Sequence, residues 1–406
     1  MATKNKSRHP GRILLLGLPM LLGLLLAGGG IVAMGLARPV LPTTASITIT
    51  SPYVVPAHPL PWPKEDNAAL VIPALQVHLS ASQERQAPIA SVTKMMTALV
   101  LIRDFPLSLG EEGPSLVMGA SAVDDWKQTV HEGGSNIEVQ EKEVLSLHQC
   151  LEALLVRSAN NIARVLAKFD AGSVEQFTER MNAYASELGM THTHYVEPSG
   201  FEAGSVSTPS DQLIAAQLLY ADPVLRDIVG RSYVDLPVAG RVASYTPLIT
   251  VKGVKGIKSG RTDVAGGCDV MVYERSIRGK TVTVFTAIMG RTGGDVLTES
   301  GLVALDLSRH ALDLVRQVQL SKRGRIVGRS ASWWGTTPLV EDQDLKALVF
   351  VGLPLQRSLA TKGLLPGSPK AAGAGMISYV APGLSVSVPL VSAEQLPKLR
   401  PWTRVR

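Results

Sequence analysis

The chain has 406 residues, of which 45% are hydrophobic and 18% charged; this balance excludes a wholly disordered chain and allows two or three domains. The net charge of +6 is small for this length. Away from the termini no stretch combines lysine and arginine with aromatic residues, so nucleic acid is not an expected partner. The two cysteines, Cys150 and Cys268, form no C-x-x-C pair. They predict either one disulfide or two buried thiols, and both alternatives stay open.

The N-terminal part of the chain predicts a membrane helix. An uncharged run over residues 13–37 is long enough to span a bilayer, since about 20 helical residues suffice. Residues 1–12 are basic, and after Arg38 no charged side chain appears before Lys64. This asymmetry predicts a cytoplasmic N-terminus, a single span, and the rest of the chain outside the cytoplasm at the cell membrane. A cleaved signal peptide followed by secretion is the alternative.

The next segment, residues 38–66, is rich in proline, which fixes φ and resists helix, so it predicts an extended linker. A globular domain follows over residues 67–320. Its hydrophobic periodicity predicts helices and strands in mixed order, which is typical of an α+β fold. The predicted strands are 69–72, 75–79 and 281–289, and the predicted helices are 91–104, 145–168, 173–188 and 298–318.

The last part, residues 321–406, changes in composition to short apolar runs separated by glycine and proline. This pattern predicts a small β-rich C-terminal domain that ends in a basic tail. Trp333 and Trp334 are predicted to belong to its core, and strands are expected around residues 348–351, 377–380 and 388–391.

The chemistry of the chain is predicted from Ser91 and Lys94, which stand three residues apart at a predicted helix start. Residues i and i+3 share a helix face, so the lysine amine is within reach of the serine hydroxyl. A serine nucleophile needs a base, and a neutral lysine serves where burial and nearby cations lower its pKa. Alone the pattern is weak, because an N-cap serine followed by a solvated lysine has the same spacing.

Two further patterns strengthen this interpretation. Ser158-Ala159-Asn160 follows a predicted apolar helix, and Lys258-Ser259-Gly260 lies in a glycine-rich stretch before an apolar run. The three patterns each occur once, in the order Ser-x-x-Lys, Ser-x-Asn, Lys-Ser-Gly. That order is the one described for penicillin-binding proteins and class A β-lactamases.

With these motifs the chain resembles the D-alanyl-D-alanine carboxypeptidases of the low-molecular-mass penicillin-binding proteins, serine peptidase family S11. The resemblance extends over about residues 62–320, with further likeness in 188–201 and 207–211. It implies a penicillin-binding/β-lactamase-like serine transpeptidase fold, with an antiparallel sheet and a helical subdomain, for the catalytic domain. It also implies a peptidoglycan stem peptide ending in D-Ala-D-Ala as substrate, β-lactam antibiotics as covalent inhibitors, and no metal or cofactor.

The family's roles carry over residue by residue. Ser91 resembles the nucleophile, Lys94 the base, and Ser158 the residue that relays a proton to the leaving amine. The backbone N–H groups of Ser91 and Arg261 resemble an oxyanion hole. The resemblance implies substrate contacts from Asn160, Lys258, Ser259, Gly260, Arg261 and Thr262, of which Lys258 and Ser259 meet the terminal carboxylate.

Some positions depart from the family pattern and leave rival functions open. Ala159 and Arg261 are unusual, which leaves room for a weakly active or non-catalytic penicillin-binding scaffold. A β-lactamase-like hydrolase is the nearest rival, but Glu197 lacks the asparagine that accompanies the deacylating glutamate of class A enzymes. A transpeptidase would use the same acyl-enzyme, and the motifs do not separate it from a carboxypeptidase.

Overall fold

The structure is a computed structural model, and it describes residues 11–47, 53–54, 59–64, 67–81 and 84–400. The chain forms two compact units. One comprises Val55–Gln317 with Leu348–Leu353, and the other comprises Met1–Val54, Val318–Ala347 and Pro354–Arg406. The predicted boundary near residue 320 falls close to Gln317, where the chain leaves the first of these units and returns to the unit that contains its N-terminal part.

The first unit is built on a five-stranded antiparallel sheet in the order β11-β12-β13-β3-β4. Strands far apart in sequence are neighbours, since β13 pairs with β3. The central strands are buried over most of their length because both of their faces are covered. Their bounds are β3 Asn67–Ile72, β4 Val77–Ser80, β11 Val254–Thr262, β12 Gly266–Ile277 and β13 Lys280–Arg291.

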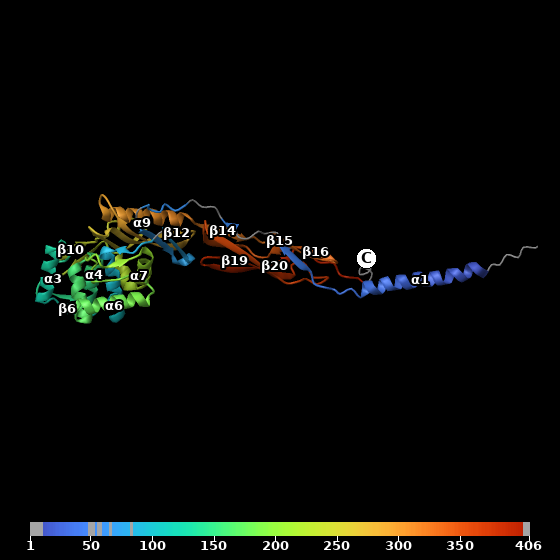
Figure 1. The fold of residues 1–406 in the computed structure, drawn as a ribbon, viewed down its shortest axis with the longest axis horizontal. Helices are drawn as coiled ribbons and strands as arrows, with labels where there is room; N and C mark the ends of the chain where they lie inside the picture. The colour runs from blue at the N-terminus through green and yellow to red at the C-terminus, as the bar shows by residue number, and fades with distance from the viewer. Residues whose placement is uncertain (1–10, 48–52, 55–58, 65–66, 82–83, 401–406) are drawn as a thin grey trace, which may run out of the picture. The chain divides into compact units, whose positions relative to one another are not determined.

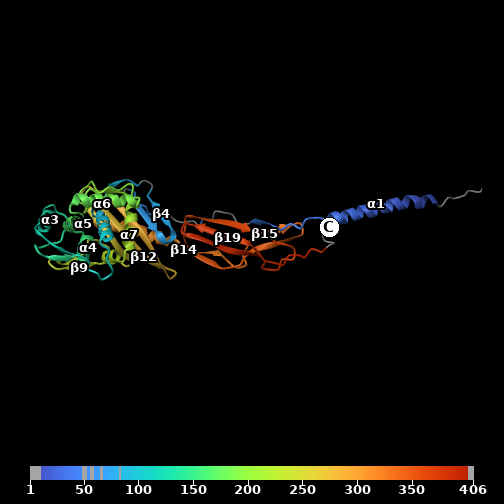
Figure 2. The ribbon, with the colours of Figure 1, turned by 90° about the horizontal axis from the view of Figure 1, so that it is seen from below.

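Helices cover the two faces of this sheet (Figures 1 and 2). Helix α9 packs on β12 and β13, and α7 packs on β13 and β3, each with its own hydrophobic core. The helices are α2 Lys94–Asp104, α3 Ala120–His131, α4 Leu147–Leu155, α5 Asn160–Ala171, α6 Val174–Glu187, α7 Pro209–Ala221, α8 Pro223–Val229 and α9 Val296–Asp313. Short strand pairs join β5 Ala87–Pro88 to β8 Val206–Ser207, β6 Ser115–Val117 to β7 Val144–Ser146, and β9 Tyr233–Leu236 to β10 Gly240–Ala243.

Two predicted helices were wrong in extent. The helix predicted over 145–168 is divided, because α4 ends at Leu155 and α5 begins at Asn160. Ser158, between them, has a left-handed φ of 65°, which a continuous right-handed helix excludes. The helix predicted over 298–318 ends at Asp313, and β14 (Val315–Ser321) follows it.

The second unit holds a seven-stranded antiparallel sheet in the order β1-β15-β16-β20-β19-β18-β2. The predicted α+β architecture with a β-rich C-terminal part is thereby confirmed. The strands are β1 Thr44–Ile47, β2 Tyr53–Val54, β15 Ile326–Ser332, β16 Gly335–Glu341, β18 Pro354–Thr361, β19 Gly373–Ala381 and β20 Leu384–Ser392; β17 Leu345–Phe350 pairs with β14.

The predicted linker over 38–66 is wrong in one respect. Thr44–Ile47 pairs with β15 and Tyr53–Val54 pairs with β18, so these stretches are edge strands of the C-terminal sheet rather than free spacer. Before them, α1 (Gly11–Leu36) contains an apolar stretch, Pro19–Leu36, that is long enough to cross a membrane. Such a helix fits either a retained anchor or a signal sequence.

Two smaller expectations are resolved by burial. Cys150 in α4 and Cys268 in β12 are both buried free thiols, so the disulfide alternative is wrong. Burial raises the pKa of Cys150 to about 12, which keeps that thiol protonated and inert. Trp334 is buried as predicted, whereas Trp333, at the tip of the β15–β16 turn, is 45% exposed.

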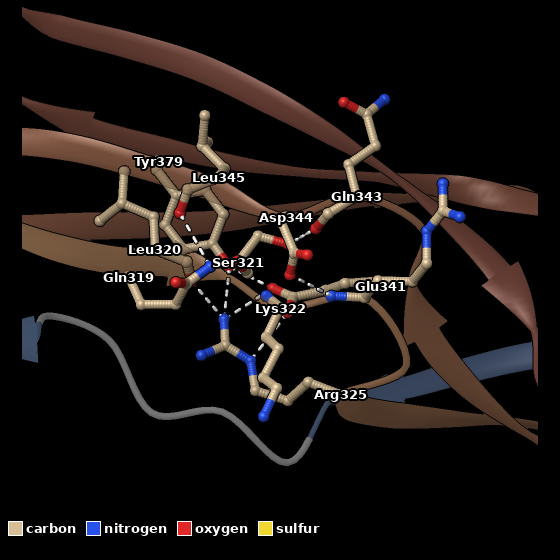
Figure 3. A network of polar contacts seen from close by, with 11 residues as sticks. Gln319, Leu320, Ser321, Lys322, Arg325, Glu341, Gln343, Asp344, Leu345 and Tyr379 are labelled. Carbon is tan, nitrogen blue, oxygen red and sulfur yellow. Dashed lines mark hydrogen bonds and ion pairs between the residues drawn. The ribbon is translucent and has the colours of Figure 1, made fainter.

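A buried carboxylate holds one end of the C-terminal sheet (Figure 3). Glu341 has no exposed surface, and Arg325 binds it through two nitrogens, with Nε–Oε2 at 2.8 Å and Nη2–Oε1 at 2.7 Å. The Tyr379 hydroxyl also donates to Oε1, and the Lys322 N–H donates to Oε2 at 3.0 Å. These donors satisfy a charge that burial alone would disfavour.

Replacing Arg325 with methionine should destabilise the protein by about 3 kcal/mol, because Glu341 would stay buried without its counter-charge. Thermal unfolding measures this change. Arg323→Met is the matched control, since Arg323 is exposed: its Nε donates to the Asp342 carbonyl at 2.7 Å and lies 4.0 Å from the Asp342 carboxylate. Equal effects of the two substitutions would contradict the assigned importance of the Glu341 site.

Candidate active site

Ser91 lies in a single 3-10 turn, Ala90–Thr93, that leads directly into α2. Ala90 has a left-handed φ of 48°, a strained conformation for a residue with a side chain. A Cβ on Gly200 would collide with the Ala90 carbonyl, so only glycine at 200 allows the two loops to approach. The predicted start of the helix at Ser91 is therefore a tight turn that other loops hold in place.

Lys94, one turn after Ser91, is entirely buried. Its Nζ lies 2.9 Å from Ser91 Oγ, 2.7 Å from Asn160 Oδ1 and 2.6 Å from the Ser199 carbonyl oxygen. Burial lowers the pKa of Lys94 well below its ordinary value, and the charge of Lys258 lowers it further. A neutral amine keeps two N–H groups for the two carbonyl acceptors and turns its lone pair to the Ser91 hydroxyl. The geometry therefore suits a general base.

The loop that carries Ser199 is held by Glu197. Glu197 Oε2 accepts from the Ser199 N–H at 2.6 Å, and Oε1 accepts from the Glu202 N–H at 3.4 Å. Thr97 in α2 also donates to the Pro198 carbonyl at 2.6 Å. The Glu197 carboxylate is thus occupied in positioning the acceptor of Lys94, and its charge raises the pKa of Lys94.

The second motif lies in the break between α4 and α5. Ser158 is fully buried, and no residue that the structure describes hydrogen-bonds to its hydroxyl. A strained, buried and unsatisfied hydroxyl is unusual and is typical of a functional site. Two residues later, Asn160 begins α5, and its Oδ1 accepts a hydrogen bond from Lys94 Nζ. A Cβ on Gly134 would lie 2.7 Å from Asn160 Nδ2, so this loop packs closely on the amide.

The third motif lies on β11 at the edge of the sheet. Lys258 is fully buried, its Nζ donates to the Ser259 carbonyl at 2.8 Å, and it lies 5.6 Å from the centre of the Tyr245 ring. Burial lowers the pKa of Lys258 to about 7, while the charge of Asp269 raises it. Lys258 is therefore poised to change charge near neutral pH.

The Ser259 hydroxyl is already engaged by a residue that the sequence did not single out. Ser259 and Asp269 are directly paired across β11 and β12, and Ser259 Oγ lies 2.6 Å from Asp269 Oδ2. Both residues are buried. Burial raises the pKa of Asp269 to about 7, against the opposing effects of Ser259 and Lys258. The family resemblance gave this hydroxyl to the substrate carboxylate, whereas here it donates to Asp269.

Gly260 has a structural role that follows from its position. A Cβ on Gly260 would lie 2.6 Å from the Ser91 backbone nitrogen and 3.1 Å from Ser91 Cα. Glycine therefore allows β11 to run directly beside the nucleophile. The family resemblance implied a substrate contact at Gly260, and in the structure the space that a Cβ would take there is occupied by Ser91 itself.

A cavity of about 680 Å³ opens at these motifs, and Ser91, Asn160, Arg261 and Thr262 all lie on its wall. Thr262 Oγ1 accepts from the Ala265 N–H at 3.0 Å. Lys94, Ser158, Lys258 and Ser259 lie buried behind this wall. The cavity is also lined by Glu132, Gly133, Gly134, Ser135, Gly200, Phe201, Tyr245, Asp263, Gly266, Arg291, Thr292, Gly293, Gly294 and Val296.

Sequence reasoning missed three residues of this site. Tyr245 and Arg291 line the cavity, and Asp269 lies behind Ser259. Arg291 ends β13 and adds a second guanidinium to the wall beside Arg261. An available signal was the position of Asp269, a charged residue between Cys268 and the apolar run that begins at Val270. The described residues contain no cluster of three or more His, Cys, Asp or Glu side chains suited to a metal.

Comparison with known proteins accords with this geometry. The family model of peptidase family S11, the D-alanyl-D-alanine carboxypeptidases, matches residues 74–292, which is more than half of the chain. The chain belongs to this family. The matched range contains all three motifs, from Ser91 to Gly260, together with Asp269 and Arg291.

Individual relatives are similar over part of their length. The D-alanyl-D-alanine carboxypeptidase DacF of Bacillus subtilis is 30% identical over 199 residues, which cover 46% of this chain and 48% of DacF. A D-alanyl-D-alanine endopeptidase of Pseudomonas aeruginosa is 33% identical over 207 residues, which cover 48% of this chain and 62% of that protein. The match thus spans about half of DacF and less than two thirds of the endopeptidase.

Solved structures share the fold. Penicillin binding protein 5 from Haemophilus influenzae superposes with a TM-score of 0.59 at 19% identity, covering 85% of this chain and all of that chain. The D-alanyl-D-alanine carboxypeptidase DacD from Francisella tularensis gives a TM-score of 0.56 at 17% identity, covering 90% and 98%. These likenesses confirm the predicted penicillin-binding fold with its C-terminal β-rich part.

Replacing Gly260 with alanine should slow acylation of Ser91 by a fluorescent penicillin about 100-fold, because the added methyl displaces the nucleophile's backbone. The rate constant of covalent labelling measures the effect. Gly119→Ala is the matched control, because a Cβ there meets no atom within 4 Å. A Gly260→Ala protein that labels at the parent rate would show that the close approach is unimportant.

Replacing Asp269 with asparagine should make acylation by penicillin more sensitive to rising pH. Since burial lowers the pKa of Lys258 and Asp269 raises it, the variant's Lys258 loses its proton at a lower pH than in the parent. The rate constant should fall by up to about 10-fold at pH 7.5 and by less at pH 5.5, the size expected for one pKa unit. Asp306→Asn, in the exposed part of α9, is the control; parallel pH profiles for Asp269→Asn and parent would contradict the assignment.

Proposed function

We propose that this chain is a serine-type D-Ala-D-Ala carboxypeptidase that removes the terminal D-alanine from peptidoglycan stem peptides. The observation that carries the proposal is the buried Lys94 amine, 2.9 Å from Ser91 Oγ and held by Asn160 and the Ser199 carbonyl. Membership of family S11 and relatives named D-alanyl-D-alanine carboxypeptidases support the same substrate class.

In the first step, Ser91 Oγ attacks the carbonyl carbon of the penultimate D-alanine while neutral Lys94 takes the hydroxyl proton. The backbone N–H groups of Ser91 and Arg261 would stabilise the oxyanion, and Gly260 brings β11 close enough for both to face one carbonyl. The C–N bond then breaks, and Lys94 passes the proton it took from Ser91 through Ser158 to the leaving amine, so that Lys94 is neutral again. D-Alanine departs, and the acyl group stays esterified to Ser91.

In the second step, water gives a proton to Lys94 and attacks the ester carbonyl. The ester bond breaks, Ser91 recovers its proton, and the shortened stem peptide leaves. Neither step requires a metal or a redox cofactor, because the proton transfers are carried by side chains with suitable pKa values.

Substrate binding in this proposal uses positive charge at the carboxylate end. Lys258, Arg261 and Arg291 supply cations, and Thr262 supplies a hydroxyl at the wall. Because Ser259 is paired with Asp269, its contribution to the carboxylate is through the placement of β11 rather than a free hydroxyl. Asn160 orients Lys94 and offers its Nδ2 to a substrate amide.

Three alternative functions, a β-lactamase, a non-catalytic scaffold and a transpeptidase, are supported to different degrees. A class A β-lactamase mechanism needs a glutamate that activates water at the acyl-enzyme, but Glu197 is engaged by two backbone N–H groups of its own loop. A non-catalytic scaffold is disfavoured by the retained side chains of all three motifs. Transfer to an amine instead of water would use the same acyl-enzyme.

A second candidate activity is cleavage of peptide cross-links. Two relatives, from Pseudomonas aeruginosa and Escherichia coli, are named D-alanyl-D-alanine endopeptidases and are 33% and 31% identical over their matched regions. Such an activity would use the same serine acyl-enzyme with a bulkier leaving amine. Whether the cavity of about 680 Å³ accepts this larger leaving amine is tested below with a cross-linked peptide.

Placement at the membrane is part of the proposal. The apolar stretch of α1 and the basic residues before it would retain the protein as a single-pass anchor, with the catalytic unit outside the cytoplasm beside peptidoglycan. β-Lactam antibiotics would act as covalent inhibitors at Ser91.

Changing Ser91 to alanine should abolish covalent labelling by a fluorescent penicillin while leaving thermal stability within about 1 kcal/mol. Gel fluorescence and thermal unfolding measure the two properties. Ser135→Ala, another serine of the cavity wall, is the control and should still be labelled. Labelling of the Ser91→Ala protein would show that another residue is the nucleophile.

The substrate is tested by giving the purified protein three compounds separately. A diacyl peptide ending in D-Ala-D-Ala should release D-alanine at a rate that Ser91→Ala reduces at least 1,000-fold. A cross-linked peptide dimer tests the endopeptidase activity, and a chromogenic cephalosporin tests the lactamase. Rapid turnover of the cephalosporin with no D-alanine release would overturn the proposal.

A further inference from the structure

The segment that follows α1 is built into the C-terminal sheet. Thr44 of β1 is paired with Ala331 of β15, and Trp334 Nε1 donates to the Leu41 carbonyl at 3.0 Å. The Thr43 N–H donates to the Leu364 carbonyl at 3.0 Å, and the Leu364 N–H donates to Thr43 Oγ1 at 2.9 Å. Residues 41–44 are therefore fixed between the β15–β16 turn and the loop after β18.

The C-terminal segment joins the same region. A Cβ on Gly335, beside Trp334, would lie 3.1 Å from Pro397 Cδ. The Gly367 N–H donates to the Pro397 carbonyl at 2.9 Å, and a Cβ on Gly367 would lie 3.1 Å from Lys398 Cγ. Four segments, 38–43, 332–335, 362–370 and 396–400, thus converge at one end of this unit.

The surface formed by these segments combines exposed apolar side chains with cations. Leu41, Trp333 and Leu365 are 60%, 45% and 56% exposed. Their neighbours include exposed Arg38, whose guanidinium lies 5.9 Å from the centre of the Trp333 ring. The four segments carry five cations and no acidic residue: Arg38, Lys362, Lys370, Lys398 and Arg400. Glu394, the nearest acid in sequence, lies outside them.

The position of this surface is limited by the chain itself. Helix α1 ends at Leu36, and Leu41 is anchored to Trp334 five residues later. An extended chain spans at most about 3.6 Å per residue, so Leu41 lies within about 18 Å of the helix end whatever the path between them. If α1 spans a bilayer, this surface is held at the level of the lipid headgroups on the outer side.

We infer that this surface, made of Arg38, Leu41, Trp333, Leu365, Lys398 and Arg400, binds the headgroup layer of an anionic bilayer. Tryptophan prefers the membrane interface, and anionic lipids attract cations that lie there. Exposed leucine and tryptophan beside acid-free basic segments match that layer in both polarity and charge. The inference rests on the proposed retention of α1 in the membrane and does not depend on the catalytic proposal.

The test uses the full-length protein, with Trp402→Phe as background, in single-copy nanodiscs. The discs contain phosphatidylglycerol and phosphatidylcholine, with a fraction of lipid brominated near the top of its acyl chains to quench nearby tryptophan. Substituting Trp333→Phe should remove at least half of the quenchable fluorescence. Trp126→Phe, in α3, is the matched control and should leave the quenchable fraction unchanged.

A charge test separates anionic lipid from general contact with the bilayer. The triple change Arg38→Gln, Lys398→Gln and Arg400→Gln should reduce quenching in anionic discs about two-fold or more and have little effect in discs of phosphatidylcholine alone. Quenching of Trp333 that is absent in anionic discs, or unaffected by the triple change, would overturn the inference. Shielding of Trp333 that increases with protein concentration in detergent would instead assign this surface to a second copy and likewise overturn it.

Failures of the separate proposals are distinguishable in the same samples. Elution of the protein apart from the discs would overturn both the membrane anchor and this inference. Co-elution with an unquenched Trp333 would overturn this inference alone. Penicillin labelling of Ser91 in the discs tests the catalytic proposal, and its result does not depend on the membrane anchor or on the headgroup-binding surface.

Discussion

The site depends on keeping the Lys94 amine out of water. An exposed lysine holds its proton at neutral pH and cannot act as a base. Here the amine is enclosed by α2, α5 and the Glu197–Glu202 loop, each of which also contributes to the geometry of Ser91 or Asn160. The close packing has costs: Ala90 and Ser158 adopt left-handed backbone conformations that cost about 1–3 kcal/mol each. The surrounding core, nearly all of it fully buried, maintains these conformations.

A second buried lysine makes the electrostatics interdependent. Lys258 lowers the pKa of Lys94, while Glu197 raises the pKa of Lys94 and Asp269 raises that of Lys258. Burial is the main cause that lowers the pKa of each lysine, and one buried carboxylate partly opposes it in each case. Because a charged Lys258 favours a neutral Lys94, the group suited to an anionic substrate terminus also favours the base form of its neighbour.

The i, i+3 spacing of Ser91 and Lys94 allowed the nucleophile and the base to be predicted, and the family resemblance implied the roles of Asn160 and Lys258. The strained turn at Ser158 was not predictable, since apolar periodicity runs through the break between α4 and α5. The Ser259–Asp269 contact arises from strand register, which sequence separation does not reveal. The role of Gly260 also needed the position of a distant backbone, that of Ser91. Strand β1 was missed because a short, proline-flanked segment has little periodicity, and its partner lies near residue 330.

The pairing of β1 with β15 gives the chain the organisation of an inserted domain. The catalytic unit occupies nearly all of the sequence between two parts of one sheet, so Thr44 and Ala331 become neighbours only after 287 residues. During synthesis, β1 emerges first and stays unpaired while the catalytic unit completes its own core. Contacts in the C-terminal sheet join residues that are far apart in sequence, so its contact order is high. We expect the sheet to form after the catalytic unit has folded. Loss of the C-terminal strands would therefore leave β1 unpaired close to α1, while the main part of the catalytic unit, Val55–Gln317, would remain one continuous segment.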